Sequence, residues 1–245
     1  MKIGAIIQAR MGSTRLPEKV MKNLLGKTVL EHVIERVKQS KLIDEIIIAT
    51  TTHDRDAVIE SEALRCGAKA FRGSEDDVLS RYYYAVKDND LDVVVRITSD
   101  CPLIDPQVLD EVIQYYVNND YDIVSNAGSD LSKRTYPRGL DTEVFSFKVL
   151  ENAFINVKET YQREHVTPYI YENSIGVYYY KNHIDYSKHR WTLDTDEDFN
   201  LISEIYKHLY HGKHDFYLSD IVKLFEVKPE LFNINAHIEQ KKLNN

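Results

Sequence analysis

The sequence lacks the features that mark secreted and membrane-spanning proteins. Its 245 residues include only two cysteines, Cys66 and Cys101, and these form no paired motif, which indicates a reducing compartment. It contains no apolar run of about eighteen residues, the length that a membrane-spanning helix needs. The N-terminus also lacks the basic region and the long apolar core of a signal peptide. We therefore expect a cytoplasmic protein with no membrane partner.

An excess of basic residues is missing as well. The chain has 31 Lys and Arg residues against 39 Asp and Glu residues, and its formal net charge is -8 at pH 7. Binding to a nucleic-acid duplex requires a broad basic face, so we expect no nucleic-acid partner. A single nucleotide remains possible, because a local cationic loop can oppose the overall charge.

Two common phosphate-binding motifs are absent. The tripeptide at residues 26–28, Gly-Lys-Thr, looks like the end of a P-loop, but Met21 stands where that motif requires its first glycine. The dinucleotide-binding fingerprint also fails, because only one glycine, Gly12, follows closely after the first apolar segment. If the chain binds a nucleotide, it does so with another loop.

A metal motif is not evident among the C-terminal histidines. His208, His211 and His214 are evenly spaced. However, Gly212 interrupts the helix, and no cysteine lies nearby to complete a ligand set. We therefore favour a solvated helix end over a zinc site.

What the sequence does contain is a cationic loop directly after its first apolar segment. Residues 3–7 read as a buried strand, and residues 8–19 form the loop. The loop carries three cations and one acid: Arg10, Arg15, Lys19 and Glu18. The small residues Gly12 and Ser13 let backbone N–H groups point inward, and such a concavity with flanking cations can hold a polyphosphate. A solvated basic turn is the simpler alternative.

Residues 9–19, ARMGSTRLPEK, resemble the nucleotide-binding signature of the acidic-sugar cytidylyltransferases. That family includes the acylneuraminate and 3-deoxy-manno-octulosonate enzymes, and the most similar branch is the one named for spore coat polysaccharide biosynthesis. The resemblance implies transfer of CMP from CTP to a sugar acid or related acceptor, with release of pyrophosphate, for surface polysaccharide synthesis. It also implies use of Mg²⁺ and a homodimer.

Strands and helices alternate along the first half of the chain. The predicted order is strand 3–7, helix 28–38, strand 46–49, helix 54–65, strand 69–71, helix 75–86 and strand 93–97. This alternation predicts an α/β fold with a mainly parallel twisted sheet flanked by helices. The resemblance further implies the Rossmann-like arrangement of the nucleotide-diphospho-sugar transferases.

The second half is expected to complete one domain. Predicted helices cover 106–117, 148–157, 162–172, a segment after Thr195 or Asp196, and one or two segments from 218; predicted strands cover 121–125, 138–147 and 175–180. Residues 240–245 are expected to be frayed. With no linker or repeat in view, residues 1–245 are expected to form a single nucleotidyltransferase domain, in which about 126–190 supply an acceptor-side lobe over the crevice.

Two acids stand out as candidate metal ligands. Asp100 follows the apolar strand at residues 93–97, and ligands of parallel sheets sit at the carboxyl ends of strands, where the cationic loop also lies. In the family that this chain resembles, the acids of an Asp-x-Pro-Leu element and of an Asp-Thr-x-x-Asp element hold metal. Here they correspond to Asp100 and Asp194. The simpler alternatives are a turn cap for Asp100 and a generally acidic neighbourhood for Asp194.

The candidate site residues fall into three groups. The resemblance implies a catalytic role for Arg10, Lys19, Asp100 and Asp194, with Arg10 and Lys19 on the β and γ phosphates. The candidate nucleotide-binding residues are Gln8, Ala9, Arg10, Met11, Gly12, Ser13, Arg15, Lys19, Thr50, Arg72, Thr98, Ser99 and Asp100. The acceptor candidates are Asp77, Arg138, Asp141, Glu143, Arg163, Glu164, His165 and Arg190. An arginine among them can fork onto a sugar carboxylate or phosphate, and a structural ion pair is equally compatible.

Two other functions remain as alternatives. Residues 194–196, Asp-Thr-Asp, also match the Asp-x-Asp metal pattern of glycosyltransferases. That interpretation leaves the cationic loop unexplained, because a nucleoside diphosphate sugar has no γ-phosphate. A non-catalytic nucleotide-binding regulator is disfavoured, because Lys19, Asp100 and Asp194 are all present.

Overall fold

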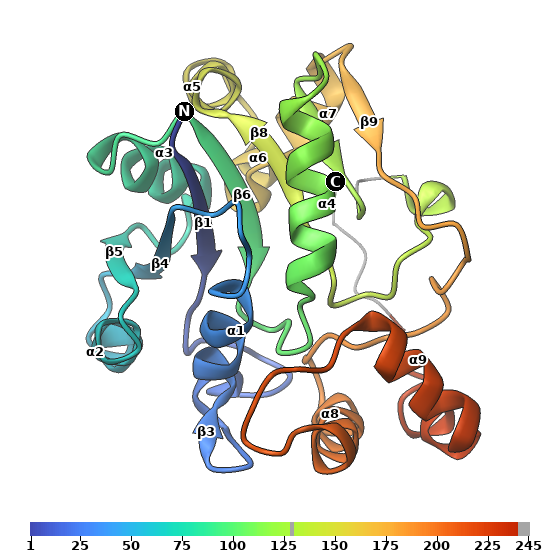
Figure 1. Cartoon of the computed structure of the whole chain (residues 1–245). Helices are drawn as coiled ribbons and strands as arrows, with labels where there is room; N and C mark the ends of the chain where they lie inside the picture. The colour runs from blue at the N-terminus through green and yellow to red at the C-terminus, as the bar shows by residue number, and fades with distance from the viewer. Residues whose placement is uncertain (128–129, 240–245) are drawn as a thin grey trace.

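A single seven-stranded sheet runs through the computed structural model, which describes residues 1–127 and 130–239 (Figure 1). The strand order is β5-β4-β1-β6-β8-β7-β9. The first four strands in this order are parallel, β8 is antiparallel to both of its neighbours, and β9 is parallel to β7. The sheet is therefore mainly parallel, as the alternation of strands and helices predicts.

The bounds of the elements follow the predicted order closely. The strands of the sheet are β1 Ile3–Gln8, β4 Glu45–Thr51, β5 Lys69–Gly73, β6 Val93–Thr98, β7 Ile123–Ser125, β8 Glu143–Ser146 and β9 Val177–Tyr179. The helices are α1 Val29–Val37, α2 Ala57–Arg65, α3 Val78–Asp88, α4 Pro106–Val117, α5 Phe147–Asn156, α6 Thr160–His165, α7 Pro168–Asn173, α8 Asp196–Leu209 and α9 Leu218–Val227. Short 3-10 segments are η1 Lys19–Met21, η2 Asp54–Asp56, η3 Leu131–Lys133 and η4 Pro229–Ile234.

The two faces of the sheet carry separate apolar cores, because successive side chains of a strand point to opposite faces. Ala5 and Ile7 of β1 belong to one core, which also contains residues of α1, α4 and α8. Ile6 belongs to the other, which contains residues of α3, α5 and α7. The result is a three-layer arrangement that leaves the ends of the strands accessible to loops.

Local signals in the sequence set several helix starts. The Thr28 hydroxyl accepts a hydrogen bond from the Glu31 backbone N–H (3.0 Å) at the start of α1. Asp105 caps α4 with Pro106 in the first helical position. Thr195 caps α8 in a reciprocal capping box. Each cap satisfies backbone N–H groups that the helix itself cannot.

The prediction of one helix over 162–172 is wrong, because α6 ends at His165 and α7 begins at Pro168. Proline has no backbone N–H, and inside a continuous helix its ring would clash with the carbonyl group four residues earlier. Between the two helices, Val166 adopts a positive φ of 72°.

Three other boundaries also differ from the prediction. The predicted strand over 138–147 is reduced to β8, because Gly139 has a φ of +99° and Arg138 makes only an isolated bridge with Arg190. Thr50 and Thr51 continue β4 instead of ending it. A short hairpin of β2 Asn23–Leu24 and β3 Lys27–Thr28 was not predicted.

Within residues 1–127 and 130–239, none of the helices combines the length and apolar character required to cross a membrane. The predicted fraying of residues 240–245 lies outside the described residues.

Candidate active site

The carboxyl ends of the central parallel strands gather the predicted residues. The arrowheads of β1 and β6 point to the same side of the molecule, where α1 and α8 lie (Figure 1). Gln8 ends β1, Arg72 is near the end of β5, and Thr98 ends β6. Strand direction alone therefore brings the cationic loop and the loop of Asp100 to one edge.

Lys19 joins the two acids that the sequence singles out. Its Nζ lies 2.7 Å from Asp100 Oδ2 and 2.8 Å from Asp194 Oδ1. Arg15 NH2 lies 3.0 Å from Asp194 Oδ2. Lys19 and Asp194, which are 175 positions apart along the chain, thus belong to one ion network.

The two acidic loops are also held together through their backbones. The Leu193 N–H donates to the Asp100 carbonyl oxygen (2.8 Å). On the other side of Asp100, the Thr98 hydroxyl donates to its Oδ1 (2.6 Å). These bonds fix the separation of Asp100 from the segment that carries Asp194.

A buried network supports Asp194 from behind. Arg190 NH2 donates to Asp194 Oδ2 (2.9 Å), and Arg190 also forms two bonds to the fully buried carboxylate of Asp198. Asp198 Oδ2 accepts the backbone N–H of Asp194 (2.9 Å), and the Asn235 amide donates to both Asp198 and the Arg190 carbonyl. Neither Asp198 nor Asn235 was among the site residues predicted from the sequence.

The network keeps Lys19 and Asp194 charged. Burial alone would lower the pKa of Lys19, but Asp100 and Asp194 outweigh it and the pKa is raised. Burial would raise the pKa of Asp194, but Lys19, Arg15 and Arg190 outweigh it and the pKa is lowered. Asp194 is therefore ionised and Lys19 is protonated near neutral pH.

Carboxylate oxygens are the donors that Mg²⁺ prefers. Asp100 and Asp194 form such a pair, and a positively charged group, the Lys19 ammonium, already lies between them. The residues present therefore fit a divalent cation.

Several candidate nucleotide-binding residues lie at or just after the ends of strands, at the same edge as this pair. The Met11 N–H donates to Asp56 Oδ1 (2.8 Å), which fixes the cationic loop to the turn after β4. Gln8 Oε1 accepts bonds from Tyr82 and from Arg96.

Other members of this group contribute through the backbone or are buried. The Ala9 N–H donates to the Ala49 carbonyl oxygen, and the Ser99 N–H donates to that of Gln8. Arg72 donates to the backbone oxygens of Thr51 and His53, and Thr50 is fully buried. Ser13 accepts the N–H of Leu16.

Most acceptor candidates already have partners inside the protein. Asp141 pairs with Arg134 (2.6 Å), which the sequence did not single out. Asp77 pairs with Arg163 (2.9 Å). Arg190 belongs to the network behind Asp194.

The remaining candidates differ in exposure. Glu143 is buried and bonded to Arg96, Thr167 and Tyr171. Glu164 is exposed and His165 is half-buried on α6. Arg138 lines a small pocket with Lys188 and Asn235.

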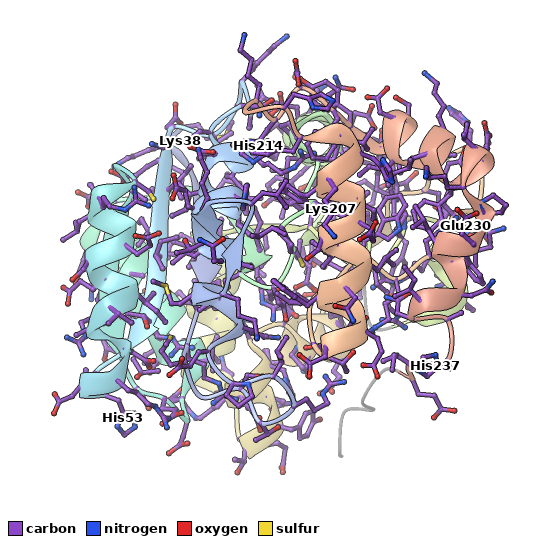
Figure 2. The ribbon with its side chains drawn as sticks, turned by 90° about the horizontal axis from the view of Figure 1, so that it is seen from below. Lys38, His53, Lys207, His214, Glu230 and His237 are labelled. Atoms are coloured by element: carbon purple, nitrogen blue, oxygen red, sulfur yellow. The ribbon has the colours of Figure 1, made fainter. Side chains whose placement is uncertain are left out.

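His214 is buried and packs against His32 of α1. A hydrogen bond joins His32 Nδ1 and His214 Nε2 (2.8 Å), and His32 Nε2 is bonded to the Leu24 carbonyl oxygen. Figure 2 shows His214 and His53 in separate parts of the molecule. The link between His32 and His214 was invisible in the sequence, because 182 positions separate the two residues.

Comparison with known proteins gives three findings. The cytidylyltransferase family model matches residues 4–242. An uncharacterised protein of Methanocaldococcus jannaschii is 43% identical over 245 residues, and the match covers 98% of this chain and 97% of the relative. The spore coat polysaccharide biosynthesis protein SpsF of Bacillus subtilis is 32% identical over 237 residues, and the match covers 92% of this chain and 94% of that protein. The solved structure of a cytidylyltransferase from Leptospira borgpetersenii matches with a TM-score of 0.89 and 33% identity, covering 99% of this chain and all of the other.

Proposed function

The chain belongs to the cytidylyltransferase family. We propose that it transfers the CMP group of CTP to a sugar acid or related anionic acceptor, for surface polysaccharide synthesis. The observation that carries the proposal is the meeting of Lys19 with Asp100 and Asp194. A cationic loop and two carboxylates at one strand edge are what a triphosphate with its metal requires.

In this reaction, an acceptor hydroxyl oxygen attacks the α-phosphorus of CTP. A bond forms between that oxygen and phosphorus, the bond to the bridging oxygen breaks, pyrophosphate leaves with the electron pair, and the hydroxyl loses its proton. Negative charge grows on the non-bridging and leaving oxygens. The cations of the loop, Arg10, Arg15 and Lys19, would balance that charge.

Asp100 and Asp194 would hold Mg²⁺, which when bound neutralises phosphate charge. The Lys19 ammonium now lies on the same two carboxylates. Lys19 would therefore change partners when the nucleotide binds, leaving the acids and contacting phosphate oxygens. Arg190, held by Asp198, would remain behind Asp194 and keep its carboxylate oriented.

Arg138 is the acceptor candidate best suited to bind an anion. Among residues 1–127 and 130–239, its guanidinium has no hydrogen bond or ion pair, whereas the nearby Arg134 is paired with Asp141. Burial and the neighbouring Arg134 lower the pKa of Arg138. A carboxylate or phosphate of the acceptor would relieve that repulsion and match the planar guanidinium.

Pyrophosphate release from CTP, measured with Mg²⁺ and a panel of 2-keto sugar acids and phosphorylated sugars, tests the proposal. Release is expected with a sugar acid and is expected to disappear in Lys19→Ala and in Asp100→Ala while the fold is retained. Normal turnover in either variant would contradict the assignment. Preferential binding of a nucleotide sugar over CTP in calorimetry would favour a glycosyltransferase instead.

We also propose a cytoplasmic homodimer, as the resemblance implies. Of the consecutive tyrosines at residues 82–84, Tyr82 is buried and Tyr83 stacks on Phe154 with ring centroids 4.2 Å apart, while Tyr84 is exposed. Light scattering should give about twice the 28.6 kDa mass of the chain. A mass that stays at that of one chain at all concentrations would count against the dimer.

A further inference from the structure

Arg10 of the cationic loop belongs to a group of charged residues whose other members take no part in the reaction as described above. Glu75 lies at its centre, and we name it the Glu75 cluster. Arg55 NH2 is 2.6 Å and Arg10 NH1 is 3.5 Å from Glu75 Oε1, and His53 Nε2 is 2.6 Å from Glu75 Oε2. A single carboxylate is thus shared by two guanidinium groups and an imidazole.

The fold brings these residues together at the same edge as the cationic loop. Arg10 follows β1, Arg55 lies in the turn after β4, and Glu75 follows β5, and these three strands are parallel neighbours. The turn is bonded to the loop, because buried Asp56 accepts the Met11 N–H (2.8 Å). Figure 2 shows His53 beside the end of α2 at which that helix begins.

The Arg55 guanidinium lies close to Gly12 of the cationic loop. A Cβ atom added to Gly12 would lie 2.8 Å from Arg55 NH2 and 3.3 Å from Glu75 Oε1. Gly12 therefore permits the close approach of the Arg55 guanidinium to the turn that is expected to hold phosphate.

A third arginine lies near Glu75. Arg81 is buried, and its burial and the closeness of Arg10 lower the pKa of its guanidinium. Arg10, Arg55 and Arg81 thus lie near one partly buried carboxylate. A group with more negative charge and more oxygen atoms would satisfy them better, as a phosphate does.

We propose that Arg55 is a further residue that binds the β and γ phosphates of the nucleotide, and that Glu75 is an internal anion that the phosphates displace. The proposal rests on the proposed function, which places Arg10 on the same phosphates. The Arg10 and Arg55 side chains are 48% and 52% exposed, and exposed ion pairs contribute little stability, so the exchange of partners requires little free energy. Glu75 would hold both arginines near the loop until CTP arrives.

The two halves of this proposal predict effects of opposite sign on calorimetric binding of CTP with Mg²⁺. Arg55→Ala is expected to weaken CTP binding about tenfold, since a charge-assisted contact is lost, and to leave CMP binding unchanged. Glu75→Gln is expected to strengthen CTP binding several-fold, because the competing carboxylate is gone. Arg65→Ala, which removes a similarly exposed arginine at the end of α2, serves as the matched control and should leave the binding of both ligands unaffected.

Three results would overturn the proposal: unchanged CTP binding in Arg55→Ala, equal weakening of CTP and CMP, or weaker CTP binding in Glu75→Gln. Thermal unfolding of each variant shows that the fold is retained. The proposed function fails separately. If CTP binds through Arg55 but no acceptor yields pyrophosphate, the role of Arg55 stands and the transfer reaction does not.

Discussion

The Lys19 ammonium lies between the two carboxylates that would hold a metal ion. Its ammonium contacts Asp100 and Asp194 at 2.7 and 2.8 Å, and Arg15 and Arg190 approach Asp194 as well. The charges of the site are thus balanced by the protein itself. Nucleotide binding would release Lys19 to the phosphates and leave the acids for the metal.

The first prediction follows from this competition at the residue scale. Lys19→Met removes the internal cation but keeps much of its apolar volume, so the nucleotide-free protein should bind Mn²⁺ about tenfold more tightly than the wild type. Electron paramagnetic resonance titration of free Mn²⁺ measures this. Lys22→Met, which removes a cation three residues further along the chain, is the control. Unchanged or weaker Mn²⁺ binding in Lys19→Met would contradict the competition.

The second residue-scale prediction concerns the support of Asp194. Asp198→Asn removes the fully buried charge that pairs with Arg190 and should lower the free energy of unfolding by about 3 kcal/mol, because buried Arg190 loses one of its two carboxylate partners. Urea denaturation measures the loss. Asp196→Asn lies in the same helical turn but is exposed, so its effect should stay within about 1 kcal/mol. Equal losses of unfolding free energy in the two variants would contradict the larger contribution expected of the buried Arg190–Asp198 pair.

At the scale of the element, Gly139 allows the segment before β8 to pack closely against the backbone at Trp191, in the segment that leads to Asp194. Gly139 has a φ of +99°, and a Cβ there would lie 2.5 Å from the Trp191 backbone. This close approach permits the bridge between Arg138 and Arg190. The local backbone therefore affects both the acceptor side and the support of Asp194.

A pair of glycine substitutions separates strain from steric overlap. Gly26 also has a positive φ, +90°, but a Cβ there would meet nothing within 4 Å. Gly26→Ala should cost about 1 kcal/mol in unfolding free energy from backbone strain alone. Gly139→Ala should cost about 3 kcal/mol or more, because the Trp191 backbone must also move. Similar costs measured by urea denaturation would contradict the close approach.

At the scale of the whole molecule, buried histidines set how the fold responds to acid. Burial lowers the pKa of His189 to about 4 and that of His214 to about 3. The folded protein keeps both neutral, whereas the unfolded chain binds protons below about pH 6.5. Stability should therefore fall as pH drops from about 6.5 towards those values.

His189→Phe tests this response, because His189 lies among Trp191, Phe225 and Phe232. Between pH 7 and pH 5, the wild type should lose up to about 2 kcal/mol of unfolding free energy through His189, and the variant should lose correspondingly less. Urea denaturation at several pH values measures the slope. His183→Phe, at an exposed position, should keep the wild-type slope. An identical slope in His189→Phe would contradict the buried neutral state.

Local chemistry determined most of the fold. Apolar strands, caps such as Thr28 and Asp105, and the alternation of strand and helix are short-range signals, and they predicted the parallel sheet and the strand edge where Lys19 and Asp100 meet. Where a local signal was overlooked, at Pro168, the prediction failed and the helix proved to be two.

Only the tertiary structure decided which charges face one another. The sequence offered Arg190 as an acceptor contact and gave no indication of Asn235, yet both lie behind Asp194 in one network with Asp198. It likewise gave no sign that Arg55 and Arg10 share Glu75. Periodicity fixes which elements form, but the partner of a long charged side chain depends on how distant loops approach in space, and no local pattern encodes that approach.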